Sequence, residues 1–147
     1  MSRRALLLAA SLVLAASPLA AEGTLVIIVN VDSGITRMTP GEATNVFMGR
    51  QKRLASGVVA IPMELNLPTD LRDLFYKRLI HLPLSSVRAY WARLLFSGQA
   101  QPPRLVDSAE EMIELVAANK GAVGFLEKDK LSRRVRAVLE LGAEPGS

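Results

Sequence analysis

The turn at residues 66–72 carries the side chains best suited to binding chemistry in this sequence. Thr69 is predicted to be the N-cap of a helix, with Pro68 just before it and a strand further upstream. Apolar residues at helical spacing follow at Leu71, Leu74, Phe75 and Leu79. A helix start placed after a strand is a common anion site, because free backbone N–H groups and the helix dipole converge there. The turn therefore either holds a ligand or is only a well-capped connection.

Two asparagines and an arginine complete this candidate site. Asn30 ends a predicted strand, and Asn66 follows the next one. If those strands are parallel neighbours, both amides face the rim on which the helix begins. The amides would then contact a ligand or partner, or they serve as turn residues. Arg72 lies one turn into the helix, where it pairs with a nearby carboxylate such as Asp73 or Asp32, or points into water.

The composition argues against an enzyme. There is no cysteine, which excludes disulfides, thiolate metal sites and thiol nucleophiles. His81 is the single histidine, so no metal-site spacing exists, and no serine stands in a recognisable nucleophile turn. We therefore predict no catalytic residue, no metal and no cofactor.

Apolar and capping patterns predict the elements that position the candidate site. Continuous apolar runs predict four strands, at 24–30, 58–65, 122–127 and 135–141. Capping boxes predict helices after Thr39 and Ser108, and two further helices begin near Thr69 and Ser85. The segment 97–107 is expected to be an extended connection. This order predicts an α/β fold of three layers, with a mostly parallel sheet of about four strands.

Trp91 follows Tyr90 on the predicted helix that begins near Ser85. An aromatic cluster of this kind is typical of a helix packed onto the core. An exposed Trp91 would instead indicate a docking face.

The N-terminus has the layout of a secretory signal peptide. Arg3 and Arg4 precede an apolar run from Ala5 to Ala16, and small residues follow at Ala20 and Ala21. We predict a signal peptide at 1–21, a single domain at 22–147 and a periplasmic location. Cleavage would remove two of the 18 basic residues and none of the 14 acidic ones, leaving a net charge of +2. Such a balance gives no reason to expect a nucleic-acid partner.

Four segments together resemble the phosphate-type substrate-binding proteins of bacterial ABC transporters, in particular their small single-lobe relatives. The segments, in chain order, are ATNVFMGRQKRL, VVAIPMELNLPTDLRDLFY, VRAYWARLLFSGQAQPPRLV and NKGAVGFL. VFMG is similar to the IF-x-G of that family, and GAVGF is similar to its GAIGY. The resemblance runs from Leu25 to Leu126 and implies a single lobe of a periplasmic-binding-protein-like fold.

The resemblance also implies an oxyanion site, from which this sequence departs. The family presents an Arg and then Ser-Gly-Thr at a helix start, which fall near Leu65 and on Thr69, Asp70 and Leu71. Thr69 keeps a hydroxyl, whereas Leu65 supplies no guanidinium and Leu71 no hydroxyl. Asp70 adds a carboxylate that would repel an anion, although an acidic first turn suits a helix without a ligand.

Two functions remain open. In one, the chain is an exported binding protein for phosphate or another small oxyanion, associated with phosphate uptake and completed by a second copy or another subunit. In the other, it is a non-catalytic interaction module that has lost phosphate binding and docks onto an envelope or membrane protein. The predicted ligand-binding residues are Asn30, Asn66, Thr69, Asp70, Leu71 and Arg72.

Overall fold

The structure, a computed structural model, describes residues 23–98 and 100–142, with the side chain of Thr69 excepted. The signal peptide predicted at 1–21 lies outside these residues. The described residues form five strands, four α-helices and a short 3-10 turn. In chain order they are β1 (Leu25–Asn30), α1 (Pro40–Phe47), β2 (Ile61–Leu65), α2 (Thr69–Ile80), α3 (Leu84–Ser97), β3 (Arg104–Val106), α4 (Ala109–Ala118), β4 (Ala122–Glu127), η1 (Lys128–Lys130) and β5 (Val135–Leu141).

The five strands form one sheet in the order β3-β2-β4-β1-β5. β2 pairs in parallel with both β3 and β4, whereas β1 runs antiparallel to its neighbours β4 and β5. Four strands therefore point the same way and β1 alone runs against them, which confirms the mostly parallel sheet.

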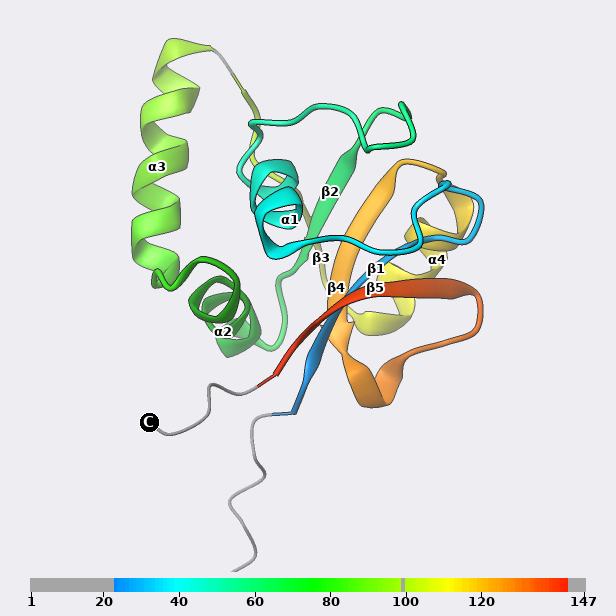
Figure 1. The fold of residues 1–147 in the computed structure, drawn as a ribbon. Coiled ribbons are helices and arrows are strands. Elements are labelled where there is room, and N and C mark those ends of the chain that lie inside the picture. The colour runs from blue at the N-terminus through cyan, green and yellow to red at the C-terminus, as the bar shows by residue number, and fades with distance from the viewer. Residues whose placement is uncertain (1–22, 99, 143–147) are drawn as a thin grey trace, which may run out of the picture.

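Helices cover both faces of the sheet, as the three-layer prediction requires (Figure 1). On one face, α1 and α2 bring Phe47 and Phe75 onto Phe125 of β4. The Phe75 and Phe125 rings stack with centroids 3.9 Å apart, and Phe47 meets Phe75 edge-on at 4.9 Å. On the other face, Met112 of α4 lies directly over Gly124, where a Cβ would come within 2.3 Å of its sulfur. The glycine thus lets α4 approach the sheet closely.

The predicted helix starts are largely confirmed. Thr39 and Glu42 form the full capping box of α1, with Pro40 in the first turn. Ser108 Oγ accepts the Glu111 N–H at 3.1 Å, but the Glu111 carboxylate accepts the Asp107 N–H at 3.5 Å, so the second box is only half formed.

Two details of the prediction were wrong. Thr69 is the first residue of α2 and not its N-cap, a position that Pro68 occupies without any side-chain acceptor. The segment 97–107 contains β3, a three-residue edge strand that was expected to be plain connection. Within residues 23–98 and 100–142, no helix combines the length and apolar character needed to cross a bilayer.

The start of β1 and the end of β5 lie side by side, because Leu25 pairs with Leu141. Arg78 of α2 joins this corner from the helix side. Its Nη1 donates to the carbonyl oxygens of Gly23 at 2.7 Å and Leu141 at 3.1 Å. One guanidinium therefore ties α2 to both ends of the described chain.

Candidate functional site

The carboxyl ends of β2 and β3 lie side by side at one edge of the sheet, the edge formed by the ends of the strands, where α2 and α4 begin. The two strands are parallel, with Leu65 opposite Val106, and the Asn66 N–H continues the pairing by donating to the Val106 carbonyl at 2.7 Å. In open α/β sheets, ligands bind at this edge. The predicted residues from Asn66 to Arg72 all come from it.

The start of α2 presents few groups that could bind an anion. Asp70 is exposed in the first turn, and Leu71 is buried in the core. The Leu71 N–H donates to the Pro68 carbonyl at 3.0 Å, so one of the first N–H groups of the helix already has an acceptor. Leu65, at the position where the resemblance implies an arginine, is 2 % exposed.

Asn66 makes its side-chain contact within the same edge. Its Nδ2 donates to Asp107 Oδ1 at 3.2 Å, across from the end of β2 to the end of β3. Asp107 is exposed and, like Asp70, carries a carboxylate. The negative charges of Asp70 and Asp107 therefore lie at the strand ends where an oxyanion would bind.

Asn30 lies at the opposite end of the strands from Asn66. It would lie beside Asn66 only if β1 and β2 were parallel neighbours. β1 is not a parallel neighbour of β2, because β4 lies between them and β1 runs the other way. Asn30 is 4 % exposed, and its Nδ2 donates to the carbonyls of Val116 and Ala117 at the end of α4. Its Oδ1 accepts the Asp32 N–H at 2.8 Å. These hydrogen bonds cap the carboxyl end of α4 and stabilise the turn that follows β1.

Arg72 turns inward and pairs with Glu64, a partner that sequence reasoning missed. Arg72 Nε lies 2.7 Å from Glu64 Oε2, and their side chains are only 14 % and 3 % exposed. The Tyr76 hydroxyl donates to the other oxygen, Glu64 Oε1. The three residues form a buried polar network between β2 and α2, and Asp73 and Asp32 are not the partners of Arg72. A lone acidic residue inside the apolar run of β2 was the available signal.

The buried network keeps Tyr76 in its protonated, donating form. Burial raises the pKa of the Tyr76 hydroxyl above its usual range, and the neighbouring Glu64 carboxylate raises it further. Glu64 therefore receives one hydrogen bond from a guanidinium and one from a phenol. Both carboxylate oxygens are engaged, which is the condition for holding a charge in the interior.

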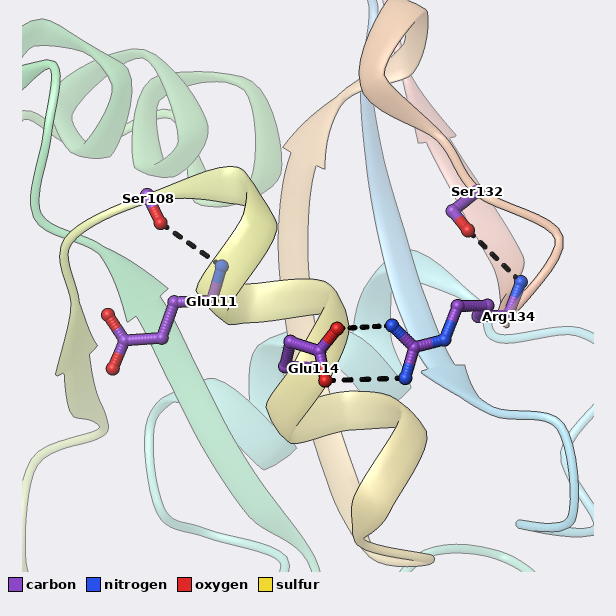
Figure 2. A network of polar contacts seen from close by, with 5 residues as sticks. All are labelled: Ser108, Glu111, Glu114, Ser132 and Arg134. Carbon is purple, nitrogen blue, oxygen red and sulfur yellow. Dashed lines mark hydrogen bonds and ion pairs between the residues drawn. The ribbon is translucent and has the colours of Figure 1, made fainter.

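A second polar network lies on the surface, over α4 (Figure 2). Arg134, just before β5, reaches Glu114 with both terminal nitrogens in a two-pronged pair. The hydrogen bond and the charge of Arg134 lower the pKa of the Glu114 carboxyl. Ser132 Oγ accepts the Arg134 N–H at 3.2 Å and shapes the turn that presents the arginine.

Several predictions about chemistry can be compared with these positions. Trp91 is 6 % exposed and packs on Gly49, which confirms its predicted place in the core. Among residues 23–98 and 100–142, no three His, Cys, Asp or Glu side chains are grouped as a metal site. The site residues brought together are Asn66, Asp70, Leu71 and Arg72, and Asn30 stands apart from them.

Comparison with solved structures shows the class of fold. It is similar to one lobe of a periplasmic-binding-protein-like α/β architecture. An ABC-type phosphate transport receptor from Vibrio cholerae superposes with a TM-score of 0.62 at 17% identity, over 79% of this chain and 46% of that one. A protein assigned to the phosphate ABC transporter substrate-binding proteins, from Clostridium perfringens and with bound phosphate, gives 0.61 at 12% identity, over 79% and 45%. PstS from Borrelia burgdorferi gives 0.56 at 10% identity, over 79% and 47%.

These similarities concern the fold. Neither a protein-family profile nor a curated relative matches the sequence. The chain spans less than half the length of the solved structures that it resembles. The first two neighbours are a phosphate receptor and a phosphate-transporter substrate-binding protein by name, and the identity of all three to this chain is too low to carry a ligand over.

Proposed function

We propose that this chain is an exported, non-catalytic binding module on a single-lobe scaffold, and that it recognises an envelope protein in place of free phosphate. One observation carries the proposal. The edge of the sheet where an oxyanion would bind presents the carboxylates of Asp70 and Asp107, while Arg72 of α2 is paired with Glu64.

The electrostatics of this edge disfavour an anion. Two like charges ~4 Å apart repel by about 1 kcal/mol in water and by more where the surroundings are less polar. Freeing Arg72 for an anion would leave the Glu64 carboxylate buried with only the Tyr76 hydroxyl as its partner. Removing one member of a buried pair is strongly unfavourable. The helix start is therefore better suited to closing the fold than to holding phosphate.

The second candidate is the binding of phosphate or a similar oxyanion, as part of phosphate uptake through an ABC transporter. The fold similarity to phosphate-binding proteins favours it. In this case a second copy of the chain, or another subunit, would have to supply the missing lobe and the positive charge that this edge lacks.

Thermal unfolding of the mature protein, residues 22–147, separates the two candidates. A ligand at 100 times its dissociation constant adds about 2.7 kcal/mol to the free energy of unfolding, which is a shift of several degrees. We expect no shift in millimolar phosphate or sulfate. A shift of several degrees with the wild-type protein would contradict the proposal and establish the oxyanion function.

A pair of substitutions shows whether the two carboxylates are the cause. Asp70→Asn with Asp107→Asn removes both charges and keeps the side-chain shapes at exposed positions. If phosphate then raises the unfolding midpoint, these charges exclude the anion from an otherwise competent site. An unchanged response would mean that the missing second lobe limits binding.

The export part of the proposal has a separate test. The chain, produced with its N-terminus intact, should appear in the periplasmic fraction with Glu22 as its first residue. Recovery of the uncleaved chain in the cytoplasm would contradict it.

A further inference from the structure

An apolar groove of about 260 Å³ runs between α3 and the edge strand β3. One stripe of α3 forms a wall, with Val87, Trp91 and Leu95 facing the hollow. Leu105 of β3 forms the opposite wall and is 49 % exposed. In Figure 1, α3 stands at the outer side of the molecule, away from the body of the sheet.

The strand beside this groove is an open edge of the sheet. β3 pairs with β2 on one side, and none of the strands in the described part of the chain lies on its other side. The Val106 carbonyl accepts the Asn66 N–H, so Val106 directs its backbone toward β2. Because backbone groups alternate in direction along a strand, Leu105 directs its N–H and C=O outward, away from β2. The groove thus has the backbone N–H and C=O of Leu105 along one side.

The charged groups of the groove favour a partner with negative charge. Arg88 of α3 lines the groove, is exposed, and forms no ion pair with any described residue. From Leu84 to Val106 the sequence has three arginines and no Asp or Glu. Glu64 and Arg72 also line the groove, but they are paired with each other, so Arg88 is the charge of the lining that has no counter-charge among the residues described.

We propose that an extended acidic peptide segment of a partner protein binds in this groove as an added strand beside β3. Its backbone pairs with Leu105, its apolar side chains enter the groove against Val87 and Leu95, and a carboxylate meets Arg88. Strand addition of this kind draws affinity from the backbone and specificity from side-chain pockets. The inference rests on the proposed function, and it names the surface that the partner uses.

A random peptide library displayed on phage, selected on the mature wild-type protein, tests the surface directly. We expect selected peptides to alternate apolar and acidic residues, and to be displaced by the same peptide added free. N-methylation of alternate peptide backbone nitrogens should abolish binding in one of the two alternating patterns, the one that removes the N–H groups facing β3. Failure to select any peptide, or full binding by both alternately N-methylated forms, would overturn the proposal.

Two arginines of α3 give a matched pair of variants. Arg88→Glu reverses the charge at the groove, while Arg93→Glu reverses a charge on the same helix that does not line it. Both side chains are exposed, so both variants should fold, which circular dichroism can verify. We expect Arg88→Glu to weaken the selected peptides by about tenfold or more and Arg93→Glu to leave them unchanged. Equal effects of the two variants would overturn the assignment to this groove.

A membrane surface is the competing occupant, because Phe96 at the end of α3 is 96 % exposed. Sedimentation with vesicles of phosphatidylglycerol and phosphatidylethanolamine, without peptide selection, would assign the surface to lipid and overturn the proposal. The phosphate titration of the preceding subsection is independent of these results. Peptide failure with no phosphate response would remove only the groove, whereas a phosphate response would remove the proposed function itself.

Discussion

Two of the ion pairs among the described residues, Glu64–Arg72 and Glu114–Arg134, differ in their surroundings far more than in their chemistry. Glu64 and Arg72 are 3 % and 14 % exposed, and Glu64 also accepts a hydrogen bond from Tyr76. Glu114 and Arg134 are 65 % and 53 % exposed and join α4 to the turn before β5 (Figure 2). Each pair joins a glutamate to an arginine, yet only the first is shielded from water on nearly all sides.

This difference decides what each arginine is free to do. A buried pair must stay complete, because either member alone would be an unpaired charge in the interior. Arg72 is therefore fixed under the candidate site and unavailable to a ligand. An exposed pair contributes little and is exchangeable with water, so Arg134 is replaceable without consequence for the fold.

The largest expected effect comes from Glu64→Gln. This change removes the charge and keeps the shape, and it leaves the Arg72 guanidinium buried without a counter-charge. We expect the free energy of unfolding to fall by about 3 kcal/mol or more. Urea unfolding followed by circular dichroism measures it.

The control for this first change is the triple variant Glu64→Met, Arg72→Met and Tyr76→Phe, which makes the network apolar at similar volume. It should recover most of the lost stability, because such replacements are often neutral. If Glu64→Gln were as stable as the wild type, the buried network would not be the rigid element described above.

A smaller loss is expected from Tyr76→Phe. The substitution keeps the ring packed against Phe75 and removes only the hydroxyl that donates to Glu64. A hydrogen bond to a charged group is worth about 1.5–3 kcal/mol, and the loss should lie in that range. Tyr90→Phe is the matched control. It removes a hydroxyl that donates to the Met48 carbonyl at 2.8 Å, a bond to a neutral group, and should be less costly.

Alkaline pH gives a third test of the buried network. The pKa of Tyr76 is raised in the folded chain, so above pH 10 the unfolded chain loses this proton while the folded chain keeps it. Its stabilisation is complete below the unfolded pKa and declines as pH rises, by up to about 1.4 kcal/mol per pH unit. Urea unfolding between pH 9 and 11 should show a steeper decline in the wild type than in Tyr76→Phe. Identical slopes would contradict the raised pKa.

The smallest effect is expected from Glu114→Gln in the exposed pair. We expect no measurable change in the urea midpoint at neutral pH and physiological salt. The pKa of Glu114 is lowered, so any stabilisation from the pair exists above the unfolded pKa and is lost as pH falls below it. Comparison of wild type and variant at low salt, from pH 7 to 3, measures this contribution. A loss comparable to that of Glu64→Gln would erase the distinction between the two networks.

The elements of the fold were predictable because each depends on local pattern. The continuous apolar runs gave the main strands, and Thr39 with Glu42 gave the start of α1. β3 was missed, because three residues after two prolines carry too little periodicity to indicate a strand. The direction of β1 was also missed, since an apolar run is the same whichever way it is traversed.

The candidate site was predictable only in part, for the same reason. Asn66 and Asp70 lie near each other in the sequence and therefore in the fold. Asn30 was expected near them and lies at the far edge, because that expectation depended on the direction of β1. The pairing of Arg72 with Glu64 depends on how α2 lies over β2, which no spacing in the sequence specifies.

Arg78 has a mechanical consequence for the corner where β1 begins and β5 ends. The two strands are antiparallel neighbours, and the start of β1 lies beside the end of β5. A force that pulls these two ends apart would therefore break the hydrogen bonds between the strands one pair after another. The first bonds to carry that load are those from Arg78 to Gly23 and Leu141. Tension on the ends would thus reach α2 before it reached the sheet interior, and the domain would yield at low force from this corner.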